Sequence, residues 1–119
     1  MAGVESRDFS NPDETRTPDK TKVELVNVGG GQIGRYTFQP GWRWSECIKP
    51  VVGTDSCQVE HIGYGVAGQL HVTHEDGSAS DINPGDVYRI APGHDAAVAG
   101  DEPFVSVEFQ GAANYAKPS

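Results

Sequence analysis

The residues that could carry out chemistry gather in two stretches of this 119-residue chain. The stretch from Pro40 to Gly68 holds both cysteines, both tryptophans and one of the four histidines. The stretch from Pro84 to Val98 places another histidine directly after a Pro-Gly turn. Thiolate and imidazole are good ligands for zinc and iron(II), and imidazole also exchanges protons near neutral pH. The two stretches therefore predict two halves of one pocket.

His61 is the first candidate for that pocket. In an extended strand it shares a face with Gly63 and Gly65, whose missing side chains would leave space beside the imidazole. We expect His61 to point into a barrel, where it would ligate a metal or act as a catalytic acid or base. The alternative is a buried neutral imidazole that is hydrogen-bonded to the backbone.

Cys47 and His94 are the other predicted metal ligands. Cys47 shares a strand face with Ser45 and Lys49, and its thiolate could meet His61 across neighbouring strands. The alternative is an apolar core thiol, because free cysteine is among the most buried residue types. His94 is expected to face inward near the barrel mouth, and the alternative is an exposed turn histidine.

Cys57 precedes His61 by four residues. In an extended strand this separation is about 13 Å, too far for the two side chains to share one metal. The limit relaxes if Cys57 belongs to a loop. We interpret Cys57 as a structural cysteine, free in a reducing compartment.

Four further residues are candidates for the pocket wall. Lys49 on an inward face would be costly without a partner, so it could bind a substrate carboxylate or act as a base. The alternative is that Pro50 turns the chain outward and Lys49 reaches solvent. Arg43 is a weaker candidate of the same kind. Tyr64 and Tyr88 are expected mainly to pack, with a second role in contacting the substrate.

The elements that must position these residues are short strands. Residues 22–28, 32–39, 42–49, 57–68, 69–74, 79–82, 87–90, 94–99 and 103–110 alternate apolar and polar types or are rich in β-formers, and Gly and Pro turns separate them. Such spacing predicts a closed barrel or sandwich. On the strand 42–49, Trp42 and Trp44 would face away from the pocket. Residues 1–21 form a polar N-terminal arm, 22–110 the barrel and 111–119 a tail.

Composition excludes several classes of function. A net charge of −8 opposes nucleic-acid binding, which requires a basic surface. No apolar run approaches the roughly 18 residues that span a bilayer, and the N-terminus has no signal-like apolar segment. We therefore expect a cytoplasmic protein that binds neither nucleic acid nor membrane.

The turn spacing resembles the cupin superfamily, whose members are jelly-roll barrels also described as double-stranded β-helices. Gly85, five residues, Ala91-Pro92-Gly93, two residues and Ala96 match the second cupin motif in spacing. In the first motif, Gly41 is followed five residues on by Cys47-Ile48-Lys49, and His61 stands seven residues before Gly68. The resemblance implies the barrel fold. At the four positions that hold the metal in typical cupins, this chain has Cys47, Lys49, His61 and Ala96.

Two functions follow as hypotheses. The first is a metal-dependent enzyme for a small polar or acidic molecule, in which Cys47, His61 and His94 hold zinc or iron, and Lys49 and His61 act in catalysis. The resemblance implies dioxygenase or isomerase/lyase chemistry. The second is a non-catalytic small-molecule-binding or sensory module without metal, and a vestigial pocket is a third reading. The resemblance also implies a homodimer.

Overall fold

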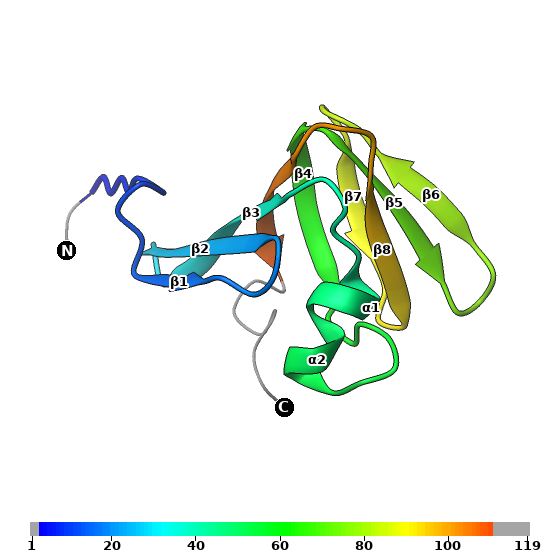
Figure 1. Ribbon diagram of the computed structural model, residues 1–119. Coiled ribbons are helices and arrows are strands. Elements are labelled where there is room, and N and C mark those ends of the chain that lie inside the picture. Colours follow the sequence, from blue (N-terminus) through cyan, green and yellow to red (C-terminus); the bar gives the residue numbers. More distant parts are fainter. Residues whose placement is uncertain (1–2, 111–119) are drawn as a thin grey trace.

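The computed structural model describes residues 3–110 as nine β-strands and two short helices (Figure 1). The strands are β1 (Glu14–Arg16), β2 (Thr21–Val28), β3 (Gly31–Phe38), β4 (His61–Ala67), β5 (Gln69–His74), β6 (Ala79–Ile82), β7 (Val87–Ile90), β8 (His94–Ala99) and β9 (Phe104–Gln110). The helices are α1 (Trp44–Cys47) and α2 (Lys49–Val52). The all-β prediction is confirmed, and most predicted strands match within a few residues.

The strands form two antiparallel sheets. The large sheet has the order β1-β2-β3-β9-β4-β7, and the small sheet has the order β6-β5-β8. The chain passes from the large sheet to the small sheet between β4 and β5, returns between β6 and β7, and crosses again on either side of β8. This arrangement places β4 and β8, which begin with histidines, on opposite sheets.

The core lies between the sheets, and strand alternation builds it. In β9, buried Phe104, Ser106 and Glu108 alternate with half-buried valines. The ring of Phe38 stacks on Trp42 with centroids 3.8 Å apart. Such aromatic pairs add about 0.5–1.5 kcal/mol beyond their buried area. An acidic residue, Glu108, is therefore directed into an interior that is otherwise largely apolar.

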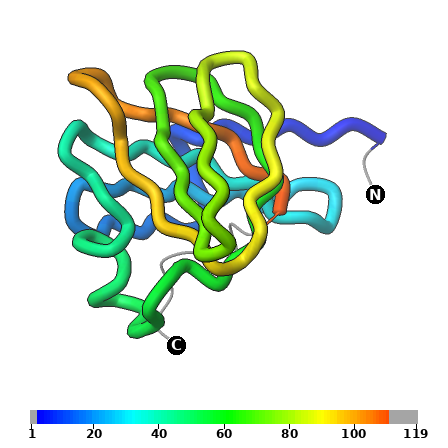
Figure 2. Tube along the Cα trace, turned by 90° about the vertical axis from the view of Figure 1, so that its right-hand side faces the viewer, coloured from blue at the N-terminus to red at the C-terminus, as the bar shows by residue number. Residues whose placement is uncertain are grey.

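The predicted strand 42–49 is wrong, because this segment turns into α1 and α2. The Cys47 amide donates to the Arg43 carbonyl at 2.9 Å, and the Ile48 amide donates to the Trp44 carbonyl at 2.9 Å. Trp44, Cys47 and Ile48 then share one buried face, which follows the helical spacing of three and four residues. The two tryptophans also fit a two-residue period, so the pattern alone favoured a strand. Figure 2 shows the helical segment beside β8, which it contacts.

The N-terminal arm is docked on the large sheet. β1 pairs with β2, with Glu14 opposite Leu25, and the Arg35 guanidinium lies 5.2 Å from the Phe9 ring centroid. The predicted tail, 111–119, lies outside the described residues. No helix in the described part of the chain has the length and apolar character that crossing a bilayer requires.

Candidate metal centre

Three buried side chains converge between the sheets: Cys57, His61 and His94. One ligand atom from each lies within 4.8 Å of the other two. The Cys57 Sγ and the His61 Nε2 are 3.7 Å apart. Tetrahedral coordination with a Zn–S bond of about 2.3 Å and a Zn–N bond of about 2.0 Å places such a pair about 3.5 Å apart. The distance between the Cys57 and His61 donor atoms therefore matches tetrahedral coordination, and the His94 donor lies within reach of both.

The ligands come from three different parts of the fold. His61 is the first residue of β4 in the large sheet, and His94 is the first residue of β8 in the small sheet. Cys57 lies in the loop before β4 and forms an isolated β-bridge with His94. In this bridge the Cys57 amide donates to the His94 carbonyl at 2.8 Å, and the Gly93 amide donates to the Cys57 carbonyl at 2.7 Å. Gly93 has φ +97°, which favours glycine at this turn.

A buried carboxylate fixes the orientation of His61. The His61 Nδ1 and the Glu108 Oε1 are 2.5 Å apart, and Glu108 is only 3% exposed. The other oxygen of Glu108 accepts a hydrogen bond from the Tyr88 hydroxyl at 2.5 Å. Because Nδ1–H donates to the carboxylate, Nε2 is left for a metal. Carboxylates behind ligand histidines in this way orient the ring and raise its basicity.

Gly63 makes this arrangement sterically possible. On β4 it is paired with Tyr88 of β7 on one side and with Glu108 of β9 on the other. A Cβ atom at Gly63 would lie 2.7 Å from the Tyr88 hydroxyl oxygen. The Tyr88 side chain thus occupies the position of the missing Cβ on its way to Glu108. The space predicted beside His61 exists, but the Tyr88 phenol fills the part at Gly63.

The second imidazole is fixed by the backbone. The His94 Nδ1 lies 2.7 Å from the Ala91 carbonyl oxygen. A carbonyl can only accept, so Nδ1 carries the proton and Nε2 is left for a metal. The rings of His94 and His61 meet edge to face with centroids 5.2 Å apart. Each histidine therefore has its Nδ1 atom engaged, so Nε2 is the atom that each ring can offer to a metal.

Electrostatics favour a thiolate at Cys57. Burial disfavours the charged form, but hydrogen bonds from His61 and His94 outweigh it and lower the pKa of Cys57 to about 6. Burial also disfavours a charged His61, yet the Glu108 carboxylate and Cys57 raise the pKa of this histidine to about 10. Burial and the Glu108 carboxylate raise the pKa of Tyr88 well above its usual range, so Tyr88 remains a neutral donor.

A small inner cavity adjoins the cluster, and a larger outer cavity lies further away. The inner cavity has a volume of about 20 Å³, and His61, His94, Trp44, Tyr88 and Ala96 are among the residues that line it. The outer cavity, of about 350 Å³, lies along β6 and β7. Tyr88 and Ile90 line both cavities.

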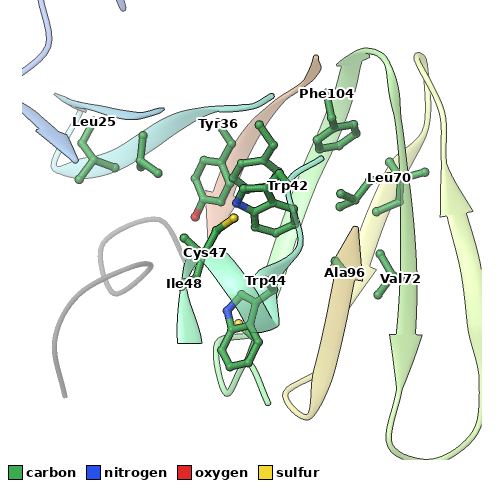
Figure 3. Close-up of a cluster of buried hydrophobic side chains, with 14 residues drawn as sticks. Leu25, Tyr36, Trp42, Trp44, Cys47, Ile48, Leu70, Val72, Ala96 and Phe104 are labelled. Carbon is green, nitrogen blue, oxygen red and sulfur yellow. The ribbon is translucent and has the colours of Figure 1, made fainter. Parts of the chain in front are cut away.

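The structure brings two of the three predicted metal ligands together. His61 and His94 belong to the cluster, but its sulfur comes from Cys57 and not from Cys47. Cys47 lies on α1 in the hydrophobic core, as Figure 3 shows beside Trp42 and Ile48. The strand distance that separated Cys57 from His61 does not apply, because β4 begins only at His61.

The predicted substrate residues fall mostly outside the cluster. The Lys49 side chain is 42% exposed and lies 3.8 Å from Asp55. The Arg43 side chain is half exposed and lies 3.7 Å from Asp95. Tyr64 is 41% exposed. Of these four residues, only Tyr88 is connected to the cluster, through its hydrogen bond to Glu108.

Trp42 and Trp44 are not on an outer face as predicted, because both are buried and line the inner cavity. Trp44 begins α1, and Trp42 lies in the segment before this helix. Ala96, at the usual fourth ligand position, is a buried cavity wall with no donor atom.

Glu108 was not predicted to belong to the site, and Cys57 was predicted to be a structural cysteine. A signal existed for Glu108, since it occupies an inward position of the alternating run from Phe104 to Gln110. No comparable signal marked Cys57, because its position depends on the bridge to His94.

No family model and no curated protein matches the sequence. Among solved structures, a protein of unknown function from Rhizobium leguminosarum bv. viciae 3841 has a TM-score of 0.65 at 18% identity, covering 99% of this chain and 100% of that one. KdgF from Halomonas sp. has a TM-score of 0.59 at 19% identity, covering 90% and 91%. A cupin-like protein of Thermotoga maritima MSB8, tm1010, has a TM-score of 0.53 at 20% identity, covering 77% and 68%.

At these identities the similarities show the fold alone. The chain has a cupin-like, all-β fold. Its buried Cys57, His61 and His94 form a site that could hold a divalent metal, and this site differs from the ligand set expected from the sequence.

Proposed function

We propose that this protein binds one zinc or iron(II) ion through Cys57, His61 and His94 and acts as a metal-dependent enzyme on a small polar molecule. The observation that carries the proposal is the three-ligand set beside a cavity. Structural zinc sites usually have four protein ligands, whereas catalytic sites have three and keep one position open. The reaction in this proposal is of the dioxygenase or isomerase/lyase type, as expected from the sequence.

Each of the three ligand residues offers one atom to the metal in this proposal. His61 and His94 offer Nε2 atoms, because their Nδ1 atoms are engaged by Glu108 and Ala91. Cys57 offers a thiolate. When bound, the metal would polarise an oxygen atom of the small molecule or activate water. The aromatic wall of the inner cavity would exclude bulk water from this position.

The alternative of a binding module without metal has less support. It leaves unexplained why the ligand atoms of two histidines and a cysteine converge inside the core. Burying such groups is costly unless they have partners. We also propose that the protein is a homodimer and that it is cytoplasmic. Sedimentation of the 12.7 kDa chain would measure its oligomeric state.

Metal analysis of protein purified without an affinity tag tests the proposal. We expect close to one zinc or iron per chain, lost in Cys57→Ser and in His61→Ala. Cys47→Ser is the matched control, since it changes a buried thiol outside the cluster and should retain the metal. Substoichiometric metal that neither ligand variant alters would contradict the proposal.

A further inference from the structure

The outward side of three neighbouring strands in the large sheet is apolar. Among the described residues, five large apolar residues are exposed, and four of them lie on this side of β4, β7 and β9: Tyr64, Val66, Val87 and Phe109. Half-buried Val105 and Val107 occupy two further outward positions of β9. We call these six residues the outer patch. A contiguous exposed apolar patch marks an interaction site.

The strand register makes the outer patch contiguous. Tyr64 is paired with Val87 on one side and with Val107 on the other, so these side chains form one row across three strands. The register of β4 and β9 shifts at two places, and the residues without a partner there are Val66 and Phe109. Bulges of this kind redirect side chains. Here they add one exposed apolar side chain on either side of the row.

The small sheet shows how an outward side looks when water covers it. On β5, buried Leu70 and Val72 alternate with exposed His71 and Thr73. An antiparallel sheet with one face in water alternates in this way, whereas strands that are buried on both faces are apolar at nearly every position. The apolar outward positions of β4 and β9 are therefore typical of strands that are covered on both faces.

The N-terminal arm covers a neighbouring part of this side of the sheet. The Phe9 ring lies 5.2 Å from the Arg35 guanidinium, and Arg35 of β3 is paired with Val107. Val66 and Val87 nevertheless remain 48% and 75% exposed. In the described part of one chain, the outer patch is therefore open.

Charge restricts which partner fits the outer patch. All six residues are uncharged, although the chain has a net charge of −8. Arg89 follows Val87 on the same side of β7, and the Glu60 carboxylate at 2.6 Å balances its charge. A nucleic acid, a basic protein or an anionic membrane would gain little electrostatic attraction at such a surface. The best complement is another uncharged apolar sheet face, which a second copy of this chain presents.

We propose that a second copy of this chain covers the outer patch, so that two chains pack through the outward sides of β4, β7 and β9. This interface rests on the homodimer in the proposed function and gives its location. A two-fold axis brings the same patch together from both chains, with the Arg89–Glu60 pair at the rim. Because two acidic chains repel each other, burial of the apolar patch supplies the attraction.

A charge placed in the outer patch tests the interface. Val87 is 75% exposed, so Val87→Glu should not disturb the folded monomer. We expect sedimentation equilibrium to show wild-type dimers and a dissociation constant larger by about tenfold or more in Val87→Glu, because like charges that meet in an interface are costly. Thr73→Glu is the matched control, since it adds the same charge to the outward side of the small sheet and should dimerise like wild type.

Salt dependence tests the source of the attraction. Raising sodium chloride from about 0.1 M to about 1 M should strengthen the wild-type dimer, because salt screens the repulsion between two acidic chains. A dimer that weakened over this range would be held by ion pairs, and this result would overturn the proposal.

Hydroxyl-radical labelling of wild type tests the location without a variant. Oxidation of Tyr64 and Phe109 should fall as the protein concentration rises through the dissociation constant, whereas oxidation of exposed His71 should not change. Protection of Tyr64 that is independent of concentration would mean that another part of the same chain covers the patch, and would contradict a second copy there.

The interface and the homodimer can fail separately. Dimers that persist unchanged in Val87→Glu would lie elsewhere on the chain and would defeat this interface alone. Wild type that sediments as a 12.7 kDa monomer at all concentrations would defeat the homodimer as well. The metal site is tested independently by metal analysis.

Discussion

The two cysteines of this chain differ at the residue scale in what surrounds each sulfur atom. Both are buried and free. Cys57 faces two imidazoles, whereas Cys47 packs in the hydrophobic core, with Asp19 Oδ2 at 3.8 Å from its sulfur. A cation or hydrogen-bond donor stabilises a thiolate, and an apolar or acidic environment does not.

We therefore expect one thiolate to form near pH 6 in the metal-free protein. Its pKa is lowered to about 6 from the ordinary 9, so the thiolate dominates above pH 6 and is lost as the pH falls through that value. Ultraviolet thiolate absorbance against pH measures this. Cys57→Ser should remove the transition and Cys47→Ser should preserve it; the reverse result would show that the wrong sulfur has been assigned.

The carboxylate behind His61 gives a second prediction at this scale. Glu108→Gln keeps an acceptor for His61 but removes the charge that makes the ring a stronger ligand. Loss of such a partner typically costs 10–100-fold in metal affinity, so we expect a loss of about that size in competition with a chelator. Tyr88→Phe is the matched comparison and should have a smaller effect, since it removes only a hydrogen bond to the other oxygen. Unchanged affinity in Glu108→Gln would refute the role.

At the scale of elements, β4 has no room for a side chain at Gly63. Gly63 lies between Tyr88 and Glu108 on the neighbouring strands, and the Val107 carbonyl oxygen is 2.7 Å from where its Cβ would be. The carbonyl belongs to the backbone of β9 and cannot move without disturbing the sheet. A side chain at this position therefore strains both the fold and the site.

We expect Gly63→Ala to lower the free energy of unfolding by about 1–3 kcal/mol, as overpacking does. Urea titration measures the change. Gly31→Ala is the control, because its Cβ would meet only the Val28 carbonyl oxygen at an ordinary 3.7 Å. Equal stability of the two variants would show that β4 tolerates a methyl group at its centre.

At the scale of the whole molecule, the metal ligands join the two sheets. His61 belongs to the large sheet, His94 to the small sheet, and Cys57 to the loop that follows α2. A bound ion would therefore hold the sheets and the loop together, and its binding energy would contribute to global stability.

We expect zinc at 100 times its dissociation constant to stabilise the protein by about 2.7 kcal/mol and to raise the melting temperature. A chelator should reverse the increase. The Cys57→Ser variant should melt at the same temperature with and without zinc. If wild type also showed no difference, the site would not hold a metal under these conditions.

The sequence determined the strands and the inward direction of both histidines. Strand alternation and Pro-Gly turns are local, so 69–74, 79–82, 87–90 and 94–99 match the observed strands residue for residue. His94 begins one of these strands, and His61 lies in the predicted strand 57–68, which is observed as His61–Ala67; the buried faces of both strands follow from the same period.

The tertiary structure decided which partners these histidines meet. The segment 42–49 fits two periods, and only packing of Trp44, Cys47 and Ile48 against the core selects the helix. Cys57 reaches the histidines because its loop bridges to β8, 37 residues further along the chain. Glu108 reaches His61 because β9 pairs with β4. These contacts join residues far apart in sequence, so local sequence patterns do not predict them.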